Sequence, residues 1–361
     1  MTAASSPTLG PTTTRGSRSG CLSKIACSVS ARCLPIGRNG MPPSSIHRMP
    51  DTAAAAPAAP LVECVPNVSE GRDRDRIESL AAAIRAVPGV TLAALHADPD
   101  HHRSVISFLG APDAIEAAAL ALAARAVALL DMRHHRGIHP RVGALDVLPF
   151  VPLAGVTMDQ TVALARRVGR AIGDRHALPV YYYGRAATRP GRETPRPLRR
   201  GEYEGLPARL ASPDGAPDDG PARFDARSGA VLVGARGVLV AFNAWLTTDD
   251  VTAAREIARA VRESSGGLAA VQAMGVLLAS RGTAQVSMNL LDYRRTPIPV
   301  VFDRVVDEAR RRRTSVSRSE LVGLAPRAAF AGRSPESVGL GRVTPDLYLD
   351  AYLEPDARRS V

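Results

Sequence analysis

Six of the eight histidines in this 361-residue chain fall within 44 residues, from position 96 to position 139. Histidine is the side chain whose ordinary pKa lies near neutrality, so such a cluster marks a place where protons can be moved. His139 stands between Gly137 and Pro140, just before an apolar run that begins at Leu145. Glycine and proline disfavour a helix there, so the backbone of a turn is expected to orient the ring. His139 is therefore the first candidate for a general base.

Other roles for these residues stay open. His139 can instead be a structural histidine whose ring bonds a carbonyl near the turn. His135 and His139 have the i, i+4 spacing of a metal pair, but that spacing needs a helix, and no Glu or Cys cluster accompanies them. We therefore expect no metal site. His101, His102 and Arg103 lie between two predicted strands, where the alternative to a binding site is a solvated loop.

Hydrophobic periodicity predicts the elements that position the histidines. The first unit has the order β-α-β-β-α-β, with a helix and a strand added at its end. Its predicted strands are 61–65, 90–96, 104–109, 145–151 and 180–183, and its predicted helices are 72–87, 112–130 and 158–175.

A second unit follows residues 184–228, which carry clustered Pro, Gly and Arg and are predicted to be a connector. Its order is again β-α-β-β-α-β, with strands at 231–243, 269–279, 284–292 and 315–322 and helices at 249–263 and 297–312. Two such units predict an α+β protein made of two tandem ferredoxin-like sandwiches. The predicted division is a disordered leader (1–60), a first subdomain (61–183), the connector, a second subdomain (229–335) and a tail (336–361).

The leader has its own composition. Residues 1–50 contain six basic residues and no Asp or Glu, which predicts disorder. Such a segment resembles an organelle transit peptide, or it results from a misassigned start codon, with Met41 or Met49 as the true start. Three of the four cysteines lie in it and only Cys64 in the body, so no disulfide framework or zinc spacing is present and a reducing compartment is expected.

Charge and composition exclude several classes of partner. Beyond residue 50, 40 basic residues face 35 acidic ones, a net charge of about +5, which disfavours duplex binding and suits a pocket for a small polyanion. RNA-recognition modules place aromatic residues on central strands, whereas strand 284–292 carries none. The apolar runs 117–124 and 147–157 are shorter than the roughly 18 residues of a membrane span. We expect neither a nucleic-acid nor a membrane partner.

Several long stretches resemble glutamate formimidoyltransferase, in the order of that family and from about residue 61 to about residue 330. The resemblance is to the transferase alone, without the cyclodeaminase domain of the fused vertebrate enzyme. The stretches are LVECVPNVSEG (61–71), DHHRSV (100–105), RGIHPRVGALDV (136–147), RGEYEGL (200–206), RESSGG (262–267) and AQVSMNL (284–290).

The resemblance implies a function and a set of site residues. The family transfers the formimidoyl group of N-formimino-L-glutamate to N5 of tetrahydrofolate, its co-substrate, in histidine degradation, and the resemblance implies a cytoplasmic homodimer. His139 takes the position of the catalytic histidine, and one ring near its ordinary pKa can serve as base and then as acid. The implied substrate-binding residues are His101, His102, Arg103 and Arg141, and the implied folate-binding segment contributes Gly220, Pro221, Arg223, Arg227 and Gly229.

Three positions depart from the family pattern. Ile138 replaces a glutamate before His139, His96 replaces an acidic residue proposed to assist that histidine, and Arg185 replaces a glutamate after Gly184. His96 is therefore the second candidate catalytic residue, to position or relay a proton. Two alternatives follow from the departures: a paralogue that acts on 5-formyltetrahydrofolate, and a folate-binding protein without catalysis.

Overall fold

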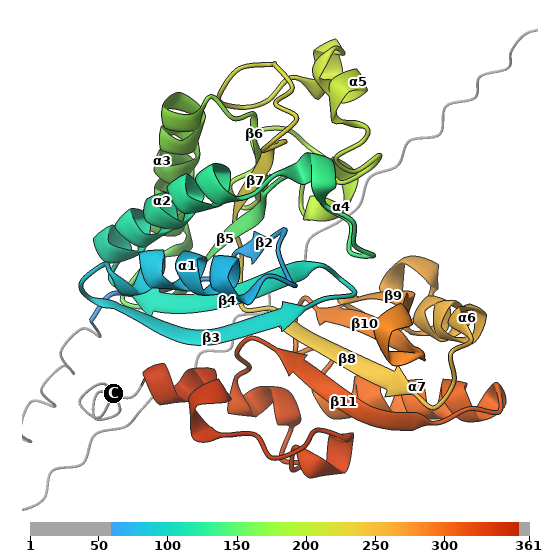
Figure 1. Cartoon of the computed structure of the whole chain (residues 1–361). Helices are drawn as coiled ribbons and strands as arrows, with labels where there is room; N and C mark the ends of the chain where they lie inside the picture. Colours follow the sequence, from blue (N-terminus) through green and yellow to red (C-terminus); the bar gives the residue numbers. More distant parts are fainter. Residues whose placement is uncertain (1–58, 354–361) are drawn as a thin grey trace, which may run out of the picture. The chain divides into compact units, whose positions relative to one another are not determined.

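The computed structural model of the protein describes residues 59–353 (Figure 1). The predicted leader lies outside these residues except for positions 59 and 60, and so do residues 354–361. Seven strands form the first sheet, in the order β1-β4-β2-β5-β7-β6 with β3 added beside β4, and all pairs are antiparallel except β5–β7 and β6–β7. The strands are β1 Leu61–Cys64, β2 Asn67–Val68, β3 Val90–Asp98, β4 Arg103–Gly110, β5 Leu145–Ala154, β6 Val180–Gly184 and β7 Val231–Ala235.

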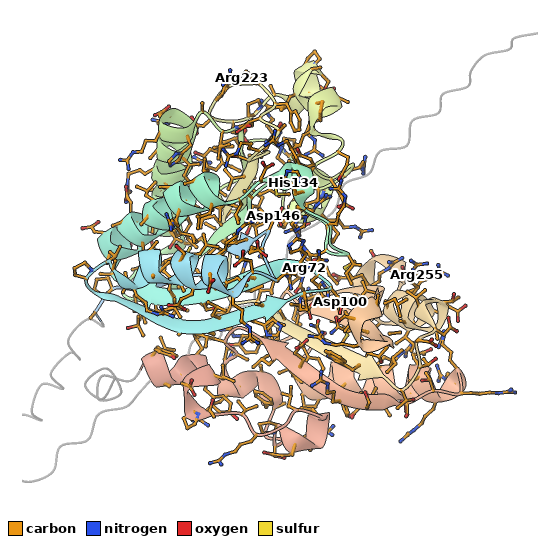
Figure 2. All side chains as sticks on the ribbon, viewed as in Figure 1. Arg72, Asp100, His134, Asp146, Arg223 and Arg255 are labelled. Atoms are coloured by element: carbon orange, nitrogen blue, oxygen red, sulfur yellow. The ribbon has the colours of Figure 1, made fainter. Side chains whose placement is uncertain are left out.

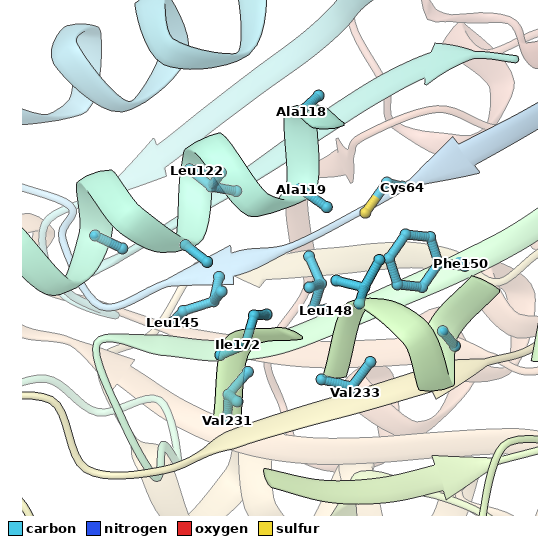
Figure 3. Close-up of a cluster of buried hydrophobic side chains, with 14 of the residues drawn as sticks. Cys64, Ala118, Ala119, Leu122, Leu145, Leu148, Phe150, Ile172, Val231 and Val233 are labelled. Atoms are coloured by element: carbon cyan, nitrogen blue, oxygen red, sulfur yellow. The ribbon is translucent and has the colours of Figure 1, made fainter. Parts of the chain in front are cut away.

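Three helices bury one face of this sheet. They are α1 Arg74–Arg85, α2 Pro112–Leu129 and α3 Met158–His176, within two residues of the predicted bounds at each end. Asp73 caps α1, Pro112 occupies the first turn of α2, and Thr157 and Gln160 form a capping box on α3. Strand and helix side chains interdigitate in a fully buried apolar core (Figure 3), which includes Cys64, Leu122, Leu148, Phe150, Ile172 and Val233.

Residues 184–228, predicted to connect two cores, instead pack on the first sheet. They form the short helices α4 Pro195–Leu198 and α5 Leu206–Leu210, whose leucines bury Tyr181, Tyr183 and Leu232 on the face that α1–α3 leave free. Because the apolar residues are few and spaced by Pro, Gly and Arg, their periodicity gives no sign of this contact.

The second sheet has four antiparallel strands in the order β11-β8-β10-β9. They are β8 Val240–Leu246, β9 Val271–Leu278, β10 Thr283–Leu290 and β11 Val316–Val322, and helices α6 Val251–Val261 and α7 Ile298–Arg311 pack against them. The predicted tail also contributes, since Val338 and Leu340 join this core.

The prediction of a single strand from Val231 to Asn243 was wrong. The run divides into β7, which pairs in parallel with β5 and β6, and β8, which pairs with β10 and β11. One apolar stretch therefore serves two sheets, and residues 236–239 link them. Hydrophobicity stays high through both strands, so the change of sheet leaves no trace in the pattern. No helix within residues 59–353 is long and apolar enough to cross a membrane.

Candidate active site

The turn between β3 and β4 carries His101 and His102 and lies directly against the His139 segment. A Cβ on Gly137 would stand 2.3 Å from the carbonyl oxygen of His101, so only glycine allows this approach. His102 has a φ of +49°, a conformation that costs a non-glycine residue free energy and is found where surrounding contacts enforce it. Two distant stretches of sequence thus hold each other in one conformation.

Glu70 anchors the turn from the other side. Its Oε1 accepts hydrogen bonds from the backbone N–H groups of Gly71, Arg72 and Asp73 at 2.9–3.1 Å and lies 3.3 Å from Nε2 of His102. Burial alone raises the pKa of Glu70, but the bonds from His102, Arg72 and Asp73 outweigh it and lower the pKa to about 2. Glu70 is therefore ionised at neutral pH, and it links the start of α1 to the turn that carries His101 and His102.

His135 and Arg141 form a second support. Nε2 of His135 lies 2.7 Å from the carbonyl oxygen of His102, and Nε of Arg141 donates to its Nδ1 at 3.2 Å. The His135 ring also stacks on His102 at 4.2 Å between centroids. Burial lowers the pKa of His135 to about 4, so the ring is neutral at pH 7. Because both of its nitrogens are engaged, His135 is not free to form the metal pair with His139 that their spacing allowed.

Arg141, implied as a substrate-binding residue, already has protein partners. Its guanidinium is bidentate to Glu204 at 2.6 and 2.7 Å and reaches Glu202 at 3.0 Å. Its side chain is buried while both glutamates are largely exposed. The structure therefore places Arg141 between the glutamates and His135, where it fixes the tautomer of that imidazole.

His139 lies beside His101, with the ring centroids 6.1 Å apart. Its surroundings are strongly positive: burial first, and then the charges of Arg103 and Arg199, lower the pKa of His139 well below its usual value. His139 as a whole residue is half-buried. At neutral pH its imidazole is uncharged, and its pKa is not near the ordinary value expected from the sequence.

Polar side chains of the second sheet reach this cluster. Nε2 of His101 lies 3.1 Å from Oε1 of Gln285 on β10, and Gln285 in turn donates to Glu320 on β11 at 3.4 Å. Glu320 lies 3.5 Å from Nε2 of His96. His96 therefore connects to His139 through Glu320, Gln285 and His101, and no hydrogen bond or ring contact joins the two histidines directly within residues 59–353.

One ion pair and two hydrogen bonds fix the turn to the loop after β9. Asp98 accepts from Arg281 at 2.7 Å and from the backbone N–H of His101 at 2.8 Å. Asp100 accepts from the backbone and the hydroxyl of Ser280. Arg72 donates to the carbonyls of Pro99 and Arg136, and Figure 2 labels it close to Asp100.

The implied folate-binding segment divides into two parts. Ser228 and Gly229 are buried against Gly143, shortly after His139, and Gly229 has a φ of +70°. Gly220 also has a positive φ and packs on Leu178, Pro221 is half-buried, and Arg223 and Arg227 are exposed. Figure 2 shows Arg223 well away from Arg72 and Asp100. Only the end of the segment at residues 228–229 lies next to the histidine stretch.

Two of the departures point away from the cluster. Ile138 is 39% exposed and only its backbone N–H is engaged, by the carbonyl of Asp100. Arg185 is exposed at the end of β6. No hydrogen bond or ion pair in the described part joins either side chain to His139.

Two depressions of about 510 and 390 Å³ lie on α2 and α3, lined among others by Leu120 and His176 and by Gln160 and Arg167. Neither includes a residue of the histidine cluster. Between residues 59 and 353 no group of three or more His, Cys, Asp or Glu side chains is arranged to hold a metal ion.

Comparison with known proteins identifies the family of the chain. The N-terminal subdomain of the formiminotransferase domain matches residues 61–236, and the formiminotransferase domain that follows it matches residues 241–334. The chain belongs to the formiminotransferase family. Both matched segments contain site residues, since His101 and His139 lie in the first and Gln285 and Glu320 in the second.

Individual relatives within the formiminotransferase family are similar over most of the chain. Glutamate formimidoyltransferase of Streptococcus pyogenes serotype M1 is 40% identical over 272 residues, which cover 75% of this chain and 91% of that protein. The enzyme of the same name from Thermoplasma acidophilum is 42% identical over 75% of this chain and 89% of its own. The formimidoyltransferase-cyclodeaminase of Rattus norvegicus is 42% identical, and the match covers 51% of its length.

Several residues of the candidate site were not predicted from the sequence. Glu70 and Gln285 lie within stretches that carried the resemblance, but nothing in their spacing pairs them with histidines 32 and 184 positions away. Arg199 precedes another such stretch, and Asp146 sits inside the one that holds His139. Glu320 had no signal, because it is an ordinary polar residue at the edge strand of a sheet.

Proposed function

We propose that this chain transfers the formimidoyl group from N-formimino-L-glutamate to N5 of tetrahydrofolate, giving 5-formimidoyltetrahydrofolate and L-glutamate. The observation that carries the proposal is His139, which belongs to the segment shared with the formiminotransferase family and is an uncharged imidazole in a positively charged site. Tetrahydrofolate is the co-substrate, as is general in the family.

The reaction needs proton transfer at two atoms. As N5 attacks the amidine carbon it must lose its proton, and the glutamate nitrogen must gain one as it leaves. His139 takes the first proton and returns it to the leaving nitrogen, so that one ring acts as base and then as acid. A positioned base of this kind contributes about 10²- to 10⁴-fold, and holding the two substrates in line supplies much of the remaining acceleration.

The supporting residues act through position. The turn that carries His101 is held by Glu70, His135 and Gly137, and it reaches the second sheet through Gln285. His96 acts on this network through Glu320, so we assign it a positioning role and expect His96→Ala to lower kcat less than loss of His139 does. The turn and segment 220–229 remain our proposed binding regions for donor and folate.

We also propose that both halves are ferredoxin-like. The spatial order of the second sheet, β11-β8-β10-β9, places the fourth strand along the chain beside the first, then the third and the second. In the first sheet the strands β5-β1-β4-β3 follow the same order, and β7 and β6 are added beside β5. A division near residue 237 follows from the pairing of β7. A homodimer and a cytoplasmic location are further proposals, which rest on the family resemblance alone.

The test is a direct assay of formimidoyl transfer. Purified protein is given N-formimino-L-glutamate and tetrahydrofolate, and 5-formimidoyltetrahydrofolate and glutamate are measured together. Equal amounts of both products, formed only with both substrates present, support the proposal. Parallel assays with 5-formyltetrahydrofolate, and binding of tetrahydrofolate without turnover, identify the two alternatives.

A further inference from the structure

Buried polar atoms without partners gather at the histidine site. Among residues 59–353, five of the seven such side-chain atoms belong to Asn67, His101, Arg103, Ser107 and Arg199. Arg103 and Ser107 share one face of β4, and Asn67 pairs with Val105 between them, so three of the five line one strip of the sheet. Buried polar groups are almost always hydrogen-bonded, so this clustering indicates that a ligand supplies the missing partners.

Arg103 and Arg199 bring an excess of positive charge to the site. Arg103 forms no side-chain hydrogen bond or ion pair with any residue of the described part. Arg199 pairs with Asp146 through one terminal nitrogen, which leaves its Nε without a partner. Burial, and next the positive charge of Arg199, lower the pKa of Arg103 to about 10.

The nearby carboxylates are already engaged. Asp146 accepts from Arg199 and from the backbone N–H of Val142. Asp98 is bonded to Arg281, and Glu320 is shared among Asn243, Gln285 and His96. One cation beside His139 therefore lacks a counter-ion, and a planar guanidinium fork is matched by a carboxylate.

We propose that Arg103 and Arg199 together form a carboxylate site that binds the amino-acid half of the formimino donor. The inference rests on the proposed function, which supplies the identity of that donor. Both substrates carry carboxylates, but those of formiminoglutamate lie a few bonds from the reacting carbon, whereas the glutamyl tail of tetrahydrofolate lies at the far end of the molecule from N5. An anion bound beside the base is therefore the donor's.

The test compares Arg199→Gln with Arg200→Gln, since Arg200 is the exposed neighbour and its side chain forms no hydrogen bond or ion pair in the described part. Loss of one charge-assisted pair should raise KM for formiminoglutamate roughly 10- to 100-fold. KM for tetrahydrofolate should stay within about threefold of the wild-type value, because the proposed site makes no contact with that substrate. Arg199→Lys, which keeps the charge but not the fork, should fall between the two. Arg200→Gln should match the wild type.

Substrate analogues show whether the bound carboxylate belongs to the donor or to the folate. N-formimino derivatives of glutamine and of γ-aminobutyrate each lack one donor carboxylate; the wild type should lose affinity for at least one of them, and Arg199→Gln should lose its ability to discriminate. Tetrahydropteroate lacks the folate tail. If the wild type discriminates against tetrahydropteroate and Arg199→Gln does not, the pair binds folate and the inference is wrong.

Measuring the binding of L-glutamate by calorimetry tests the carboxylate site separately from the proposed transferase function. Weaker glutamate binding by Arg199→Gln, with an unchanged melting temperature, supports the carboxylate site even if the wild type has no transferase activity. Normal transferase activity with an unchanged KM in Arg199→Gln overturns the carboxylate site and leaves the proposed function intact. A variant that melts lower and loses affinity for both substrates equally also overturns it.

Discussion

Replacement of Glu70 by glutamine should destabilise the protein and disable the histidine turn together. The carboxylate accepts three backbone N–H groups at the start of α1 and lies 3.3 Å from His102. The fall of its pKa from an ordinary 4.5 to about 2 corresponds to roughly 3 kcal/mol of folding free energy. Because the folded pKa is depressed, this contribution is complete above pH 4.5 and is lost as the pH falls toward 2. An amide oxygen retains part of the bonding, so we expect Glu70→Gln to lose about 2 kcal/mol at pH 7.

The assay is urea unfolding of wild type and Glu70→Gln at several pH values between 3 and 7. The stability difference should be largest at pH 7 and should shrink as the pH falls below about 4.5. Glu78→Gln, at an exposed position on α1, is the matched control and should leave stability nearly unchanged at every pH. A Glu70→Gln protein with wild-type stability at pH 7, or a loss that does not depend on pH, would refute the reasoning.

Three further predictions concern single residues. Burial raises the pKa of Glu63 to about 7, so its ionisation opposes folding as the pH rises from 4.5 through 7. Glu63→Gln should therefore raise Tm more at pH 8 than at pH 5. An equal change in Tm at both pH values would count against this prediction. Gly137→Ala should lower stability by about 1–3 kcal/mol and reduce activity, whereas Gly341→Ala, with open space around it, should be neutral in the same melting and rate assays. Burial and the charges of Arg103 and Arg199 lower the pKa of His139, so kcat/KM should not begin to fall until the pH is well below 6.5. Arg103→Gln removes one of these charges and should shift that fall in kcat/KM to higher pH. An unshifted profile would show that the charge of Arg103 does not act on His139.

The sequence predicted the elements better than their assembly. Helices such as α3 and α7 have a strong apolar stripe and clear ends, so their bounds were predicted to within two residues. The run from Val231 to Asn243 shows the limit, because continuous hydrophobicity records that a segment is buried but not in which sheet. Residues 184–228 show another, since a few leucines covering a sheet face have no period.

The site was predictable where the chain is locally constrained. Gly137 and Pro140 around His139 gave a signal because they restrict the backbone itself. Contacts such as His101 with Gln285 join residues 184 positions apart, and only the packing of the two sheets brings them together. The sequence also does not predict that Arg103 and Arg199 have nitrogen atoms without a partner, because this depends on where every nearby carboxylate lies in the fold.

The most direct test of the account is the rate of formimidoyl transfer by His139→Ala. If His139 moves the proton, kcat should fall by about 10²-fold or more, because proton transfer belongs to the transition state, while the affinity for tetrahydrofolate stays within a few-fold. A variant that melts at a lower temperature and binds tetrahydrofolate weakly, yet keeps its kcat in the fraction that remains folded, would contradict the account and identify His139 as a structural histidine.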